Sequence, residues 1–109
     1  MYNSWAGKKV IVRATTGVYF GTLVRREGKE LCLSNARRLI GWKAFKSMSL
    51  NAVATHGIQH NHSQISDFVN LWWGFAEEMF SMTNKAIHSL ETAPVAERET
   101  AKIMENSKK

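Results

Sequence analysis

The sequence has few of the features that cross-link a protein chain or attach it to a membrane. It holds one cysteine, Cys32, which cannot form an internal disulfide and excludes a multi-cysteine zinc or redox site. No apolar run approaches the roughly 18 residues that a membrane-spanning helix needs. The polar N-terminal residues lack the apolar stretch of a secretory signal. We therefore expect a cytoplasmic protein without membrane contact.

The composition is that of one ordinary globular domain. Hydrophobic residues make up 44% of the 109 residues and charged residues 22%, with a single proline, which excludes a disordered or collagen-like chain. At this length a second core has no room. We expect a single α+β domain over residues 1–94, followed by a solvated helical or frayed tail over residues 95–109.

Positive charge is concentrated in the first half of the chain. The formal net charge is +6. Residues 1–50 carry ten Lys and Arg against two Glu, whereas residues 51–109 carry five against seven acidic residues. Such a basic region attracts phosphates or acidic proteins, although exposed Lys and Arg are normal on any small domain.

The basic half has the alternation of antiparallel strands, because Val10 and Val12 share one parity and Ile11 the other. Gly17 predicts a turn, and residues 25–29 predict a hairpin connection.

Glycine and asparagine mark irregularities in these strands. Gly21 predicts a bend or bulge. Asn35 is expected to end one strand, and residues 36–42 to begin another extended segment.

Two helices are predicted in the second half. Residues 50–56 have Ser49 as N-cap and Gly57 as stop. A second helix begins at Thr83 and ends before Pro94. The expected fold is therefore α+β: a strongly bent antiparallel sheet or small open barrel with one short middle helix and a C-terminal helix.

Two segments between the helices are less regular in pattern. Residues 57–66 are predicted as a polar loop. Residues 67–80 fit two periodicities, and spacing alone leaves helix and strand open. The helical stripe comprises Phe68, Leu71, Trp72, Phe75, Ala76 and Met79. The alternating set comprises Val69, Leu71, Trp73, Phe75 and Met79.

Catalytic and metal-binding patterns are sparse. His56, His60 and His62 have no Cys or carboxylate beside them and fall in or next to the polar loop, so no metal site is predicted. Cys32 between two leucines is typical of a buried small hydrophobic residue. Since no phosphate-binding glycine loop is present either, we expect a protein without enzymatic activity and without a cofactor.

Arginines interleaved with aromatic residues favour binding instead, because this mixture suits phosphates flanked by bases. The candidate ligand-binding residues are Arg13, Arg25, Arg26, Arg37, Arg38, Trp42 and Lys43. In a strand, Arg37 and Arg38 point to opposite faces. The alternative is that Trp42 packs in the core while the arginines are solvated.

Trp72 and Trp73 form a second unusual pair. In a strand one of the two rings must leave the core, and an exposed Trp marks an interface between copies or with a partner. Open sheet edges would favour the same outcome. We therefore expect a homo-oligomer that uses Trp72 and Trp73, with burial of both rings as the alternative.

Two family resemblances follow from these motifs. Residues 7–12, 16–17, 21–23 and 31–36 resemble the first motif of Sm-like and other SH3-like small barrels, some of which form RNA-binding rings. Residues 26–30 stand where that motif has its RNA-binding Asp and Asn, and no second Sm motif follows. The resemblance implies a strongly bent antiparallel sheet.

A wider similarity is to a family of short proteins of tailed phages and prophages. Its shared motifs stand here as residues 10–13, 17–23, 36–42, 50–53 and 78–90, including its Ala-Arg-Arg-Leu/Ile-x-x-Trp core. Relatives have Trp-Tyr-Trp where residues 40–42 read Ile-Gly-Trp. The resemblance implies a phage origin and favours a strand over residues 67–80.

The expected function is non-catalytic binding. The basic N-terminal sheet is expected to engage an anionic ligand, either a nucleotide or the acidic or nucleic-acid-binding surface of a host protein. The phage resemblance and the charge together favour inhibition of bacterial defence as its use. The alternative is a small-barrel module that binds nucleic acid.

Overall fold

The computed structural model describes residues 6–42 and 49–95, which form an antiparallel sheet with two α-helices. The strands are β1 Lys9–Ala14, β2 Gly17–Glu27, β3 Glu30–Gly41, β4 Gln64–Ile65 and β5 Val69–Ser81. The helices are α1 Leu50–His56, the 3-10 helix η2 His60–His62 and α2 Asn84–Thr92. The predicted α+β class, with its bent sheet, middle helix and C-terminal helix, is confirmed.

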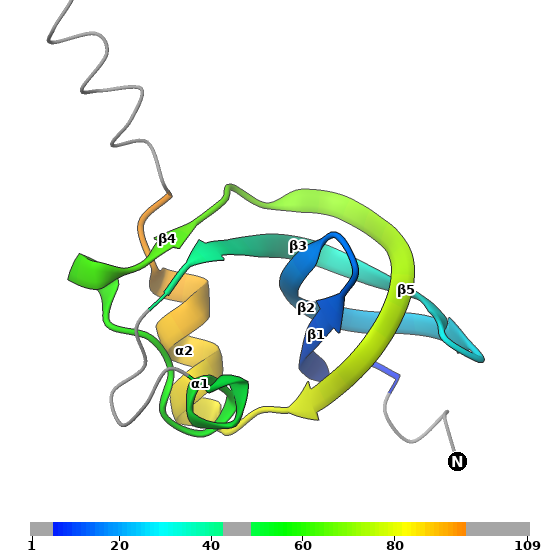
Figure 1. Ribbon diagram of the computed structural model, residues 1–109, viewed down its shortest axis with the longest axis horizontal. Helices are drawn as coiled ribbons and strands as arrows, with labels where there is room; N and C mark the ends of the chain where they lie inside the picture. Colours follow the sequence, from blue (N-terminus) through cyan, green and yellow to red (C-terminus); the bar gives the residue numbers. More distant parts are fainter. Residues whose placement is uncertain (1–5, 43–48, 96–109) are drawn as a thin grey trace, which may run out of the picture.

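The sheet closes on itself into a small barrel. β1 pairs with β2 and β5, and β3 also pairs with both of them, in each case antiparallel. β4 pairs with the end of β3. Figure 1 shows β5 curving around the ring, with α1 and α2 at one side and the tip of the β2–β3 hairpin pointing away from them. The two halves of β5 have different partners, because residues 69–75 pair with β3 and residues 76–81 with β1. The ring is therefore closed by a strand whose two halves each pair along one edge.

The inside of the barrel is filled by one parity of each strand. Val10 and Val12 are fully buried there with Leu23, Leu31 and Leu33. Side chains of the opposite parity point outward, as strand geometry requires.

A second core lies where the helices cover the outside of the barrel. Ile11 and Phe20 point outward from β1 and β2 and pack with Val53 of α1 and Leu90 of α2, all nearly or fully buried. Each helix buries a narrow apolar face against the sheet, because its other face meets water.

The predicted helix ends are confirmed by their caps. The Ser49 hydroxyl accepts a hydrogen bond from the Ala52 N–H at 3.2 Å, and Gly57 ends α1 with φ of 84°. The Thr83 hydroxyl accepts from the Ala86 N–H at 3.1 Å. These caps satisfy backbone donors that the first turn of a helix leaves open.

The segment over residues 57–66 is more structured than a polar loop. It contains η2 and β4, and Ile58 and Ile65 are each 1% exposed in the core under the helices. The loop prediction is wrong here because two isolated isoleucines give no periodic signal, yet each fills space between the sheet and a helix.

Two irregularities of the strands have clear causes. The register of β2 against β3 shifts between Phe20 and Thr22, which confirms the bend predicted at Gly21. Asn35 does not end a strand, because β3 runs through it. Its φ of 47° is the left-handed conformation that Asn tolerates.

The last described residue of the chain lies beside β4. Val95 forms an isolated parallel bridge with Ile65, and the rest of the predicted tail lies outside the described residues. Among the described helices, none is long and apolar enough to cross a membrane.

Candidate ligand-binding site

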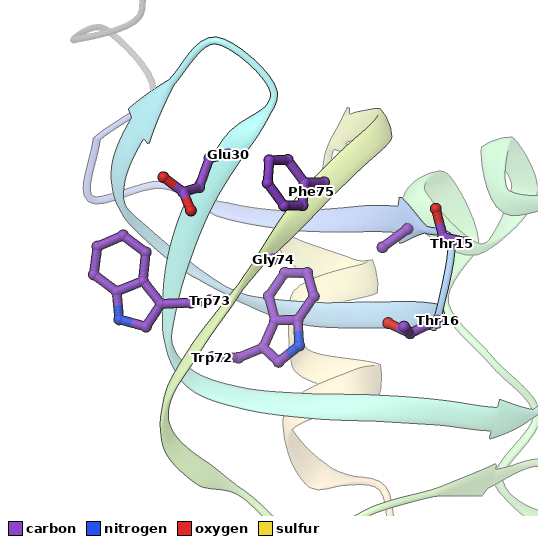
Figure 2. A pocket seen from close by; sticks show the side chains of 8 residues that line it. Thr15, Thr16, Glu30, Trp72, Trp73, Gly74 and Phe75 are labelled. Carbon is purple, nitrogen blue, oxygen red and sulfur yellow. The ribbon is translucent and has the colours of Figure 1, made fainter.

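Two adjoining hollows lie where the N-terminal half of β5 passes the β2–β3 hairpin. The smaller has a volume of about 190 Å³ and the larger about 300 Å³. The smaller is lined by Arg25, Glu27, Glu30 and Trp73. The larger is lined by Ala14, Thr15, Thr16, Glu30, Trp72, Trp73, Gly74 and Phe75. Since Glu30 and Trp73 line both hollows, the two form one region, named here the Trp73 site. Figure 2 shows the side chains that line the larger hollow.

Strand register brings the outer residues of this site together. Cys32 of β3 lies between Arg25 of β2 and Trp73 of β5, and Glu30 lies opposite Phe75. Directly opposed residues share a face of the sheet. Cys32 is 1% exposed although it points outward, so the larger neighbours cover it. Its burial raises the pKa of the thiol.

The inner wall depends on a stacked pair of rings. The Trp72 ring lies 4.0 Å from the Tyr19 ring at an interplanar angle of 21°. The Tyr19 hydroxyl is 2.9 Å from the Thr16 hydroxyl. A Cβ at Gly74 would come within 2.3 Å of the Trp72 ring. Glycine is therefore required at position 74 for Trp72 to fold over the strand.

The outer face of β5 is apolar and open to solvent. Val69, Leu71, Trp73 and Phe75 are exposed by 51%, 52%, 55% and 63%. The register against β1 then shifts next to Glu77, and Met79 packs with the barrel interior. The alternating pattern over residues 67–80 is thus a strand, but its first four apolar residues face outward.

Seven residues of the site are absent from the predicted set: Ala14, Thr15, Thr16, Glu27, Glu30, Gly74 and Phe75. The shared parity of Trp73 and Phe75 was the available signal for Phe75. Nothing local distinguishes Glu30 or the two threonines, because only the pairing of distant strands brings them to the Trp residues.

Among the predicted residues, the structure brings Arg25, Trp72 and Trp73 together. Arg26 follows on the same hairpin, and its Nε donates to the Gly28 carbonyl at 2.8 Å. The predicted oligomer-interface role of Trp72 and Trp73 stays a prediction, which sedimentation velocity can test. Of the two, Trp73 is the more exposed ring, because Trp72 packs against the barrel interior.

Three cations of the basic half form ion pairs with carboxylates. Arg25 contacts Glu27 at 2.6 Å, and Arg13 contacts Glu78 at 2.6 Å, which raises the pKa of Arg13. Lys9 pairs with Glu91. Each of these three cations therefore has a carboxylate beside it that offsets its charge locally.

Arg38 and Arg13 do not line the Trp73 site. Arg38 donates to the Thr16 carbonyl at 2.7 Å and lies 5.9 Å from the centre of the Tyr19 ring. Arg38 thus supports the turn that carries Thr16, while Arg13 lies along β1.

Arg37 is 1% exposed and lies away from the open surface that the sequence suggested. Its Nη1 donates to the Leu90 and Ala93 carbonyls at 2.9 and 2.8 Å, and its Nε donates to the Ser66 carbonyl at 2.8 Å. The two bonds from Nη1 satisfy carbonyls at the C-terminal end of α2. Burial lowers the pKa of Arg37.

The remaining predicted residues lie elsewhere. Trp42 is half-buried and packs against the core under the helices, as the alternative interpretation held. Lys43 lies outside the described residues. Within the described ranges no group of three or more His, Cys, Asp or Glu side chains could hold a metal ion.

Comparison with known proteins gives a family but no activity. No curated protein and no solved structure matches the chain. One family, described as "Domain of unknown function (DUF6948)", matches residues 7–90. This span contains the whole barrel and most of α2. The chain belongs to the DUF6948 family.

Proposed function

We propose that this protein is a non-catalytic binding module that holds a nucleotide unit at the Trp73 site, either free or within a single strand. The observation that carries the proposal is the position of two exposed rings, Trp73 and Phe75, beside the Glu30 carboxylate and the Arg25 guanidinium.

The aromatic residues supply a stacking surface. Bases stack on exposed aromatic side chains in proteins that bind single strands, and such contacts contribute about 1–3 kcal/mol per base. The larger hollow, of about 300 Å³, is at the lower end of the size range of small-molecule pockets. One planar ring fits this space better than a larger ligand does.

The charged residues suit the edges of such a ligand. The Glu30 carboxylate can accept hydrogen bonds from the amino group of a base. Arg25 can bind a phosphate through two parallel N–H groups. Its ion pair with Glu27 joins side chains that are 64% and 67% exposed, and exposed pairs contribute little. A phosphate can therefore compete with Glu27.

The phage resemblance supports one biological use of this binding, the sequestration of a nucleotide that bacterial defence uses as a signal. A second candidate is a nucleic-acid-binding small barrel, which the closed ring of strands favours. The two differ in salt dependence, because a strand that contacts several cations loses affinity steeply as salt rises.

Calorimetric titration tests the proposal. The four ribonucleoside monophosphates and single-stranded ten-nucleotide DNA and RNA are the probes, each at two salt concentrations. At least one probe is expected to bind, and Trp73→Ala to weaken it about tenfold or more. Leu71→Ala is the matched control, since Leu71 is equally exposed on β5 but lines neither hollow.

Two results would contradict the proposal: no binding of any probe to the wild-type protein, or equal affinities of wild type and Trp73→Ala. The free energy of unfolding of Trp73→Ala in urea is expected to lie within about 0.5 kcal/mol of the wild-type value, because substitutions at exposed positions usually change it little. A stability loss as large as that of a core substitution would show that lost binding reflects lost structure.

A further inference from the structure

A third hollow lies on the barrel between the strands and the end of α2. It has a volume of about 310 Å³, and its lining includes Lys9, Phe20, Thr22, Asn35, Phe68 and Glu91. It shares no residue with the Trp73 site.

The buried guanidinium of Arg37 does not line this hollow itself, but two of its neighbours, Phe20 and Phe68, do. Phe20 is the register partner of Arg37 across β2 and β3. The centre of the Phe68 ring lies 4.5 Å from the Arg37 Cζ atom. The Leu90 carbonyl, which accepts from Arg37, immediately precedes Glu91. Phe68 therefore contacts the guanidinium and also lines the hollow.

Arg37 has one donor group without a partner. Its Nη2 is the single buried side-chain nitrogen or oxygen in residues 6–42 and 49–95 that makes no hydrogen bond. The described ion pairs join other groups, so Arg37 has no carboxylate in direct contact there. A buried charge without a direct counterion, and with an open donor, favours an added anion.

We infer that this hollow is a phosphate-binding site covered by Phe68. The Phe68 side chain is 44% exposed, so its ring can turn outward at little cost in packing. Arg37 Nη2, the Lys9 ammonium and the Thr22 hydroxyl are then donors around one hollow. A phosphate group accepts from several donors at once, which an ammonium, a guanidinium and a hydroxyl provide together.

Two carboxylates lie near these donors. Glu91 is paired with Lys9, so a bound phosphate replaces Glu91 at the Lys9 ammonium. Asp67 is exposed, and one of its carboxylate oxygens accepts from the Phe68 N–H at 2.7 Å. Its charge acts on Arg37 without direct contact and partly opposes the effect of burial on the Arg37 pKa. Asn35 adds an amide from its left-handed position on β3. A non-glycine residue in that conformation is a frequent feature of ligand sites.

Titration with inorganic phosphate at constant ionic strength tests the inference on the full chain, with nitrogen NMR of the arginine side chains as the readout. Phosphate is expected to shift the Arg37 Nε resonance. Phe68→Ala removes the cover and is expected to bind phosphate about fivefold tighter or better, since apparent affinity scales with the fraction of open sites. Val69→Ala, a neighbouring exposed position, is expected to bind as wild type does.

Adenosine monophosphate and adenosine distinguish the source of the phosphate. A shift of Arg37 by the monophosphate but not by adenosine supports recognition of the phosphate of a nucleotide. A shift by inorganic phosphate alone supports a site for the free ion.

Three results would overturn the inference: no arginine resonance shifts, only Arg25 shifts, or Phe68→Ala and Val69→Ala bind phosphate equally. These readouts are independent of the Trp73 site, because a shift of Arg25 alone would support that site and contradict this one. Thr22→Val supplies a second test, with an expected loss of about threefold or more for one hydrogen bond.

Discussion

Two parts of the outer surface of the barrel have similar apolar side chains and opposite surroundings. Under α1 and α2, the side chains of Ile11 and Phe20 are 0% and 1% exposed. On the N-terminal half of β5, Trp73 and Phe75 are more than half exposed. Figure 1 shows the helices at one side of the ring only. Apolar outward residues thus become core where a helix covers them, and a candidate binding surface where none does.

The comparison separates two kinds of hydrophobic residue on one small barrel. The covered region contributes to folding, because its side chains leave water when the chain folds. The open region stays in water in the described chain, and contiguous exposed apolar residues of this kind mark interaction sites. The same residue type should therefore have different effects on stability in the two regions.

A pair of leucine truncations gives the largest expected contrast. Leu90 is 0% exposed on α2, whereas Leu71 is 52% exposed on β5. Leu90→Ala is expected to lower the free energy of unfolding by about 2–5 kcal/mol, and Leu71→Ala by less than about 1 kcal/mol. Urea denaturation followed by far-ultraviolet circular dichroism measures both. Equal losses would show that the open face is also covered in solution.

A glycine at the Trp73 site gives an intermediate effect. Gly74→Ala places a methyl group against the Trp72 ring and is expected to cost about 1–3 kcal/mol. The stack of Trp72 on Tyr19 should be disturbed, which near-ultraviolet circular dichroism reports. Gly41→Ala is the control, because a Cβ there meets nothing within 4 Å. If both variants keep the wild-type spectrum, the ring does not lie over the strand.

The buried thiol gives the smallest effect and tests whether outward-facing Cys32 is covered. Because its pKa is raised in the folded state, its contribution to stability is complete below the unfolded pKa of about 8.5. It is lost as pH rises through the folded pKa, since the unfolded chain releases the proton first. The free energy of unfolding of wild type in urea should fall above about pH 8.5 more than that of Cys32→Ala. Parallel curves would mean that Cys32 is open to water.

Much of the fold follows from local signals. Ser49 and Thr83 cap helices that end where Gly57 and Pro94 predict, because capping depends on residues within one turn. The strand parity of Val10 and its neighbours follows from the pleat of the backbone. The strand over residues 67–80 was settled by family resemblance, because its spacing fits two periods equally.

The candidate site was less accessible to prediction. The sequence suggests that the arginines share one binding surface. In the structure Arg37 is buried, whereas Arg13 and Arg25 are paired with carboxylates. The side of the strand on which Trp73 lies depends on register, which sequence spacing does not give. A buried arginine is rare enough that charge alone predicts exposure.

The sequence by itself determined the ends of the two α-helices, the turn at Gly17 and the alternation of the first strand, because caps, turns and alternation act over a few neighbouring residues. The tertiary structure alone decided that the strands close into a ring, that helices cover one side of it, and that Arg37 is enclosed while Trp73 is open. Those outcomes depend on contacts between residues far apart in the chain, and no local pattern records which surfaces meet.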